Sequence, residues 1–312
     1  MSNLKYIPIS CLDETLLQPL LEDERRMWLA DLDWDYAPIQ QILVAFINQK
    51  LLPGYVAVSD SKALGYTYFL INQSRGVIGA LYAMNAPRSQ EAVDALIAMS
   101  ISYLKDTQKI KRVEAQIMPF HNLNLASAFT RNGFSHCRRY YLDLDLDNPR
   151  KKPELPSALR IVPWDATYLA RTAEMTLLSY KNQTDAEICE DYRTRTGCES
   201  YLRSLVENPG CGIFMPETSF IGLDAQGVPC GFVFCCRISN GAAIIPQIAV
   251  HPLYQGRRLG NTLMHRAFAQ LKMLGFRTVS LTVTKENLRA IEWYQRLGFK
   301  MRKEFGAYVW QR

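Results

Sequence analysis

Features of membrane, disulfide-rich and metal-binding proteins are missing from this sequence of 312 residues. No run of about 18 uncharged apolar residues occurs, so we expect no membrane-spanning helix. The N-terminal part is acidic, with Asp13 and Glu14, and lacks a cleavable apolar segment, so we expect no signal peptide. The eight cysteines show no Cys-x-x-Cys spacing and no clustering with the four histidines, so neither a disulfide framework nor a metal site is expected. These absences indicate a cytoplasmic protein with buried, reduced cysteines.

A basic tail and an aromatic RNA-binding motif are also absent, although the formal net charge is +6. Residues 1–150 hold 15 basic and 16 acidic side chains, whereas residues 151–312 hold 21 and 14. The positive excess therefore belongs to the second half, where it is interleaved through predicted helices. This distribution fits a polyanionic cofactor better than a nucleic-acid surface, so we expect no nucleic-acid partner and no membrane partner.

The length and an apolar content of 48% predict two ordinary domains, each with its own core. Residues 147–157 are polar, charged and proline-containing, which is typical of a linker. We therefore expect domains at residues 1–148 and 158–312. Both halves show the same predicted order: two helices, several short strands, a helix, a strand, a short helix and a final strand.

An offset of 165 residues aligns the two halves. Asn122 falls on Asn287 and Gly133 falls on Gly298 at this offset. A repeat of this length is too long for a solenoid, so it indicates two copies of one domain.

The most informative stretch lies between residues 242 and 299. An apolar strand at 244–250 is followed by QGRRLG at 255–260, which begins a helix. This loop is neither a Gly-Lys-Ser/Thr P-loop nor a dinucleotide GxGxxG motif. Its backbone N–H groups would still face an anion, and Gly256 and Gly260 would let a phosphate approach closely. The alternative is an ordinary strand-to-helix turn with solvated arginines.

The stretch resembles the GNAT acetyltransferase superfamily, and the resemblance covers roughly residues 159–312. Gln255 and Gly260 fit the superfamily's pyrophosphate loop, Gln/Arg-x-x-Gly-x-Gly/Ala, although Arg258 replaces the middle glycine. A second motif fits more closely and follows in the expected order, after one helix and one strand. Its matching residues are Asn287, Ala290, Ile291, Tyr294, Gly298 and Phe299.

The resemblance implies an α/β fold of two tandem domains, each a mixed, mainly antiparallel twisted sheet flanked by helices. Pro246 is expected to mark a break in strand pairing that opens the cofactor cleft. The implied function is N-acetyltransfer by the second domain, with acetyl-CoA as cosubstrate and a small or protein-borne amine as acceptor. The alternative is a module that binds or senses acyl-CoA without turnover, with the first domain as a scaffold. Thioester cleavage with a panel of amines would separate the two.

By the same resemblance, Tyr294 is the expected catalytic acid, because a phenol beside the thioester sulfur can protonate the departing thiolate. A packed aromatic without a catalytic role is the alternative. The first half has Phe129 at this position and no glycine in residues 85–89, so we expect it to lack the acetyl-CoA machinery. The implied cofactor-binding residues are Ile248, Ala249 and Val250, through their backbone, and Gln255, Gly256, Arg257, Arg258, Leu259, Gly260, Asn261 and Asn287.

The sequence does not identify a general base. Many relatives carry a glutamate in the strand before Val250, whereas this strand has Gln247, which cannot act as a base. Asp185 and Glu217 are candidates, although each is more typical of a solvated surface carboxylate. A water relay is a further alternative. His251 precedes a proline and is expected to cap the strand end rather than to catalyse.

Overall fold

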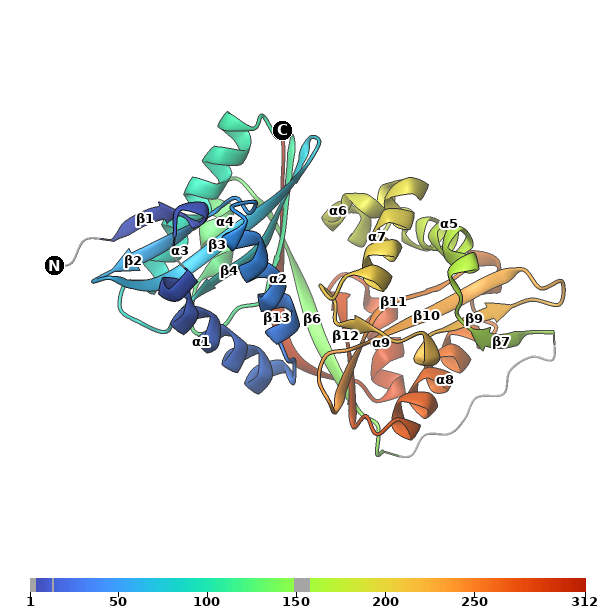
Figure 1. The fold of residues 1–312 in the computed structure, drawn as a ribbon. Coiled ribbons are helices and arrows are strands. Elements are labelled where there is room, and N and C mark those ends of the chain that lie inside the picture. Colours follow the sequence, from blue (N-terminus) through green and yellow to red (C-terminus); the bar gives the residue numbers. More distant parts are fainter. Residues whose placement is uncertain (1–3, 13, 149–157) are drawn as a thin grey trace. The chain divides into compact units, whose positions relative to one another are not determined.

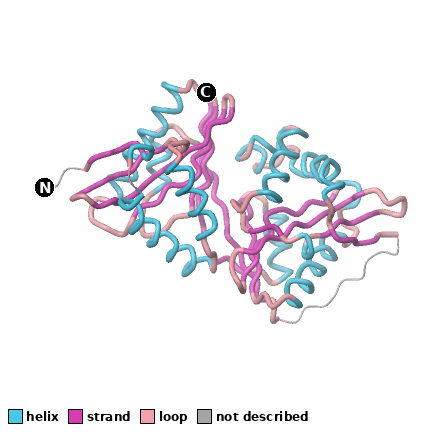
Figure 2. Tube along the Cα trace, viewed as in Figure 1, coloured by secondary structure: helices cyan, strands magenta, loops and turns pink. Residues whose placement is uncertain are grey.

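The computed structural model describes residues 4–12, 14–148 and 158–312, and the chain divides into two compact units (Figure 1). The first unit contains Met1–Arg139 and Glu304–Arg312, and the second contains Tyr140–Lys303. Most of the expected linker, residues 149–157, lies outside the described residues. Within each unit, helices flank a set of strands, as Figure 2 shows by colour.

In the first unit, a short edge strand and two helices precede the other strands of the sheet. Its elements are β1 (Lys5–Pro8), α1 (Glu14–Leu32), α2 (Ala37–Asn48), β2 (Gly54–Ser59), β3 (Lys62–Asn72), β4 (Arg75–Ala83), α3 (Ser89–Ser102), β5 (Arg112–Ile117), α4 (Leu125–Arg131) and the start of β6 (Ser135–Asp145).

The second unit repeats this order. Its elements are the end of β6, β7 (Arg160–Pro163), α5 (Leu169–Tyr180), α6 (Asp185–Ile188), α7 (Arg195–Glu207), β8 (Ile213–Phe214), β9 (Phe220–Leu223), β10 (Pro229–Arg237), β11 (Ala242–Val250), α8 (Leu259–Met273), β12 (Thr278–Thr284), α9 (Leu288–Leu297) and the start of β13 (Lys300–Gln311).

The sheets are mixed and mainly antiparallel, as expected. In the first unit the strand order is β1-β2-β3-β4-β5-β13, and in the second it is β6-β12-β11-β10-β9-β7, with β8 beside β10. The parallel neighbours are β4 with β5 and β11 with β12, each joined through one helix. The expected fold class is therefore confirmed.

Residues 188–206 have the sequence pattern of one helix, but that helix begins later than this pattern predicts. α6 ends at Ile188, a 3-10 turn spans Glu190–Arg193, and α7 begins only at Arg195. The late start has a local cause, because the Thr194 hydroxyl caps α7 by accepting a hydrogen bond from the Gly197 N–H at 3.0 Å.

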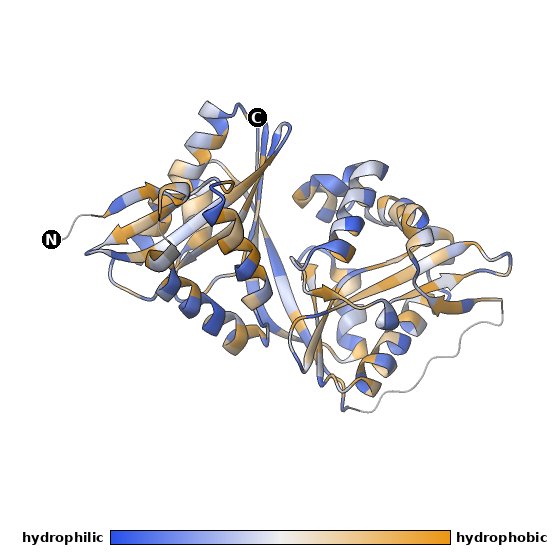
Figure 3. Cartoon of the chain, in the orientation of Figure 1, coloured by the Kyte–Doolittle hydropathy of each residue, from blue (hydrophilic) through white to orange (hydrophobic). Residues whose placement is uncertain are grey.

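Two layers of helices enclose the sheet of the second unit. One face of β10 carries Phe232 and Phe234 into a core with α5 and α7. The other face carries Val233 and Cys235 into a core with α8 and α9. Successive side chains point to opposite faces, and both faces are buried. The strands are therefore rich in apolar residues, which Figure 3 shows in orange. The cysteines are free thiols, and burial raises the pKa of Cys235 to about 12.

Two strands are divided between the units. β6 contributes residues 135–139 to the first unit and 140–145 to the second, whereas β13 contributes 300–303 to the second and 304–311 to the first. In the first unit, residues 306–311 pair antiparallel with all of β5. The last strand of each half thus completes the sheet of the other unit. The expected limits 1–148 and 158–312 remain a prediction about folding domains, and the compact units differ from them through this exchange.

The C-terminal segment also enters the core of the first unit. Tyr308 is 2% exposed and its ring stacks on Phe129, with centroids 4.0 Å apart. Among the described residues, no helix is long and apolar enough to cross a bilayer. In the same part of the chain, no group of three or more His, Cys, Asp or Glu side chains could hold a metal ion.

The exchange predicts that a substitution near the C-terminus destabilises the first unit. Tyr308→Ala removes a buried ring from its core, so we expect a loss of about 3–5 kcal/mol in the free energy of unfolding. Hydrogen exchange of the β5 amides should accelerate as well. Met301→Ala, on an exposed part of the same strand, is the control and should leave both measurements nearly unchanged. Equal effects of the two variants in denaturant titration and hydrogen exchange would contradict the assignment.

Candidate functional site

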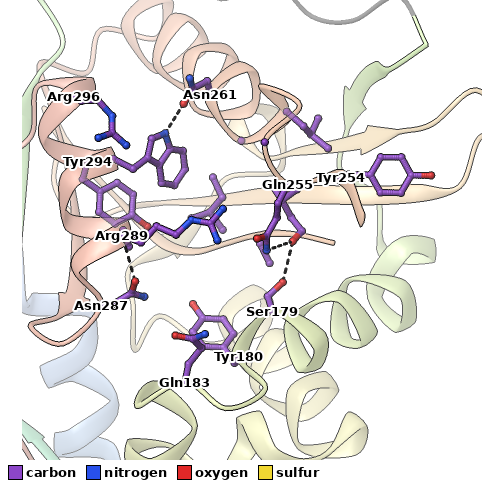
Figure 4. A pocket seen from close by; sticks show the side chains of 18 of the residues that line it. Ser179, Tyr180, Gln183, Tyr254, Gln255, Asn261, Asn287, Arg289, Tyr294 and Arg296 are labelled. Carbon is purple, nitrogen blue, oxygen red and sulfur yellow. Dashed lines mark hydrogen bonds between the residues drawn. The ribbon is translucent and has the colours of Figure 1, made fainter. Parts of the chain in front are cut away.

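A cavity of about 730 Å³ lies in the second unit, between the end of β11, the start of α8, α9 and the end of α5 (Figure 4). Every residue that the sequence places in the site lines this cavity, except Arg257. The Arg257 guanidinium instead lies over the ring of Tyr254, 5.3 Å from its centroid. The residues that do line the cavity are Ile248, Ala249, Val250, Gln255, Gly256, Arg258, Leu259, Gly260, Asn261, Asn287 and Tyr294.

The cavity exists because β11 and β12 separate early. Their parallel pairing joins Ala242–Ile244 to Thr278–Ser280 and, within the described residues, extends no further. Just beyond it, β11 has two residues, Ile245 and Pro246, opposite the single residue Cys235 of β10. Such a bulge bends the strand and increases its twist. The expected break in pairing at Pro246 is therefore present.

The bulge leaves backbone groups directed at the cavity. β10 pairs with the end of β11, and the His251 N–H donates to the Cys230 carbonyl at 2.9 Å. Because hydrogen-bonding direction alternates along an antiparallel pair, the N–H groups of Ile248 and Val250 point to the opposite edge. β12 has already left that edge. These two N–H groups are therefore available to a ligand.

The start of α8 has a tightly turned backbone. Gly256 and Arg258 both have positive φ, +77° and +63°, so the chain passes twice through the left-handed region. Arg258 stands where the superfamily's loop pattern has its middle glycine. A glycine would adopt this left-handed conformation without the strain that the arginine side chain causes. No side chain caps the helix, and its first turn contains no acidic residue. The first N–H groups of α8 therefore remain available for an anion.

Leu259 anchors this helix start to the sheet. A Cβ atom at Gly222 would lie 2.7 Å from Leu259 Cδ1, and one at Gly231 would lie 3.0 Å from its Cδ2. The leucine is 1% exposed and occupies the space that these two glycines leave on β9 and β10. The side chain of Leu259 is therefore structural, and its contribution to the cavity is the position of the backbone.

Trp293 joins the loop to α9. Its indole N–H donates a short hydrogen bond to Asn261 Oδ1, and its ring lies beside Gly260. A Cβ atom at Gly260 would be 3.4 Å from the indole, which is ordinary contact. Packing against Trp293 therefore leaves room for a methyl group at Gly260.

Tyr294 lies one residue further along α9, a helix capped by Asn287, whose side-chain oxygen accepts from the Ala290 N–H at 3.2 Å. The tyrosine is buried, and its ring packs edge-on against Phe299. Burial raises the pKa of the Tyr294 phenol well above its usual value, and nearby Tyr180 and Asp185 raise it further. The phenol is therefore held in its protonated form at neutral pH.

The opposite wall comes from the end of α5 and the turn after it, which contribute Ser179, Tyr180 and Gln183 (Figure 4). The Ser179 hydroxyl and the Gln255 side-chain amide both donate to the Val250 carbonyl, each at 3.2 Å. These bonds fix the end of β11 between the loop and α5. No sequence motif accompanies these residues, so this wall was not predicted.

Of the two candidate carboxylates, only Asp185 lies in surroundings different from those expected. Asp185 is 6% exposed, so its assignment to the solvated surface was wrong, and it accepts a hydrogen bond from Thr284 Oγ1 at 2.8 Å. Glu217 is exposed and does not line the cavity. His251 Nδ1 accepts from the Leu253 N–H at 3.3 Å, so it caps the turn after β11 as expected. Gln247 is buried, and its side-chain oxygen accepts from the Tyr192 hydroxyl at 3.3 Å.

Residues 185–299 match the acetyltransferase (GNAT) family model. An uncharacterized N-acetyltransferase of Methanocaldococcus jannaschii is 36% identical over 115 residues, which make up 35% of this chain and 48% of that protein. The match therefore spans about half the length of that curated relative. Residues 185–299 of the chain therefore match the GNAT family in sequence.

Solved GNAT structures cover the whole chain. A GCN5-related N-acetyltransferase from Sphaerobacter thermophilus superposes with a TM-score of 0.73 at 16% identity, over 99% of this chain and 95% of the other. A tandem GNAT protein from the clavulanic acid biosynthesis pathway gives 0.66 at 15% identity, over 99% and 98%. At these identities the likeness establishes the fold, which is that of two tandem GNAT-like domains.

The surroundings of Tyr294 predict its titration behaviour. An exposed tyrosine ionises near pH 10, whereas the raised pKa keeps the Tyr294 phenol protonated there. The phenolate absorbance of the Tyr294→Phe variant should therefore equal that of the unmodified protein up to about pH 11. Spectrophotometric titration of the two proteins measures the difference. A deficit of one tyrosine near pH 10 would show that the phenol is solvated.

Proposed function

We propose that the second unit transfers an acetyl group from acetyl-CoA to an amine. One observation supports this most directly: an uncapped helix start and a buried, protonated phenol line the same cavity. The first suits the pyrophosphate of coenzyme A, and the second suits the departing sulfur. The GNAT family match over residues 185–299 contains both elements.

The pyrophosphate would bind at the start of α8. The N–H groups of its first turn and the side chain of Arg258 supply partial and full positive charge at one place. The pantetheine arm would follow the open edge of β11, where Ile248 and Val250 offer backbone groups. Asn287 would act indirectly, because its side chain caps α9 and so fixes the start of the helix that carries Tyr294.

The reaction then needs two proton movements. The acceptor nitrogen attacks the thioester carbonyl carbon, the C–S bond breaks, and the nitrogen loses a proton. The Tyr294 hydroxyl gives its proton to the departing thiolate and regains one from solvent. The Val250 N–H, at the edge that β12 leaves open, would stabilise the carbonyl oxygen as it gains charge.

Fewer carboxylates could accept the proton from the amine than the sequence suggested. Glu286 is the one carboxylate among the described residues that line the cavity, and it is exposed. Asp185 is buried and does not line the cavity, although its charge raises the pKa of Tyr294. We propose that a water relay carries the proton from the amine, with no carboxylate in contact with it.

The same observation supports a second candidate, an acyl-CoA-binding module without turnover. Gln247 takes the place of the glutamate that many relatives carry in this strand. The strand residues that line the cavity, Ile248, Ala249 and Val250, have no side chain that accepts a proton. Cleavage of acetyl-CoA in the presence of a broad amine panel separates the two functions. Binding without amine-dependent release of thiol would favour the module.

The proposed acid gives a direct kinetic test. Tyr294→Phe removes the hydroxyl and keeps the ring, so acetyl-CoA affinity should change little. Turnover should fall by about 10²- to 10⁴-fold, the usual contribution of general acid catalysis. Thiol release under single-turnover conditions and calorimetric affinity are the two measurements. Full turnover with an unchanged chemical step would return Tyr294 to a purely structural role.

The proposed pyrophosphate position gives a binding test. Gly260→Asp places a carboxylate beside the phosphate, so acetyl-CoA affinity should fall by more than about tenfold. Gly260→Ala is the matched control, because its methyl group would make only ordinary contacts with Trp293 and Val250. Calorimetry with the full chain should also give one site per molecule. Two equivalent sites would mean that the first unit binds the cofactor too.

A further inference from the structure

Three arginines line the cavity, and only one of them is accounted for by the proposed pyrophosphate position. Arg258 belongs to the loop, whereas Arg289 and Arg296 come from α9. Glu286 is the one acidic side chain among the described residues that line it. The lining therefore carries an excess of two positive charges. A ligand with anionic groups at two separate places would match it.

Arg289 has no ion-pair partner among the residues that the structure describes. It lies in the first turn of α9, which contains no acidic residue. A cation in the first turn interacts unfavourably with the helix dipole. Its side chain extends from α9 over the cavity in Figure 4, rather than along the helix surface. An anion bound beside Arg289 would offset this unfavourable interaction.

Arg296 lies on the same face of α9, seven residues or two turns further along. Its guanidinium is 3.7 Å from Glu292, a long and solvent-exposed ion pair, so much of its charge remains available. Trp293 lies between the two arginines on this face and reaches the loop through its bond to Asn261. The basic face of α9 therefore continues directly from the pyrophosphate position.

Coenzyme A carries its anionic charge in two groups. One is the pyrophosphate, and the other is the 3′-phosphate monoester on the ribose, which carries a charge near −2 at neutral pH. We propose that Arg289, supported by Arg296, binds the 3′-phosphate and makes the site selective for coenzyme A over its 3′-dephospho form. This inference rests on the proposed function, since it assigns a further part of the same ligand.

The test compares binding of coenzyme A and 3′-dephospho-coenzyme A to the full chain by calorimetry. The unmodified protein should bind coenzyme A at least about tenfold more tightly, the usual value of a charge-assisted phosphate contact. Arg289→Gln should reduce the affinity for coenzyme A to that for the dephospho form and leave the latter unchanged. Arg296→Gln should produce a smaller loss, again for coenzyme A alone.

Arg195→Gln is the matched control. Arg195 is an exposed arginine in the first turn of α7 and does not line the cavity, so this variant should bind both ligands as the unmodified protein does. Thermal unfolding without ligand checks the fold. Arg289→Gln should unfold at the same or a higher temperature, because it removes a cation from a helix start.

Each other outcome counts against the assignment. Equal affinity of the unmodified protein for both ligands would show that the 3′-phosphate is not bound. Equal weakening of both ligands by Arg289→Gln would place Arg289 at the pyrophosphate instead. A larger selective loss in Arg296→Gln would move the subsite to Arg296. If neither ligand binds the unmodified protein, the proposed function itself fails, which distinguishes that result from the other three.

Discussion

The early separation of β11 from β12 is the constraint on which the site depends. A continuous parallel pair would use the N–H groups of Ile248 and Val250 in its ladder and would leave no space between the strands. The bulge at Ile245 and Pro246 turns β11 away after Ile244. Ser179 and Gln255 then hold the Val250 carbonyl at the free end of the strand. The course of the backbone thus creates the space for the cavity, and the proposed catalytic side chain does not.

The first unit has a similar bulge beside a short parallel pair of strands, and side chains of the same unit contact one another beyond it. The parallel pairing of β4 with β5 is short too and ends at Ile78 and Ala115. Just beyond it, β4 has one residue, Gly79, without a partner in β3. There the Tyr82 hydroxyl donates to Asp23 Oδ2 at 2.6 Å and lies 3.2 Å from His121 Nε2. Phe120 packs edge-on against the Tyr82 ring. The two units therefore share the bulge but differ in the side chains that follow it, which in the first unit contact one another.

The sequence predicted the parts of the site that short motifs encode. The loop at 255–261, Asn287 and Tyr294 could be named from the sequence because each belongs to a short motif that restricts several neighbouring residues. The cap that Asn287 forms on α9 was not predicted. The wall at Tyr180 and Gln183 was missed, since its position depends on how α5 packs across the sheet. The strand exchange was missed for a different reason. Alternation of apolar and polar residues shows which face of a strand is buried, but not which strand lies beside it. The pattern in β13 therefore does not show that it pairs with β5.

The two units differ at the helix start where the sequence predicts a phosphate loop in the second half alone. The backbone does not make the difference, because Arg88 has the same left-handed conformation at the start of α3 that Arg258 has at the start of α8. The difference lies three residues later. Glu91 accepts two hydrogen bonds from Arg88, at 2.7 and 2.8 Å, and so neutralises the charge at that helix start. The corresponding residue of α8 is Asn261, whose side-chain oxygen is taken by the indole of Trp293. Arg258 therefore keeps its charge for an anion, because an uncharged amide stands where the first copy has a carboxylate.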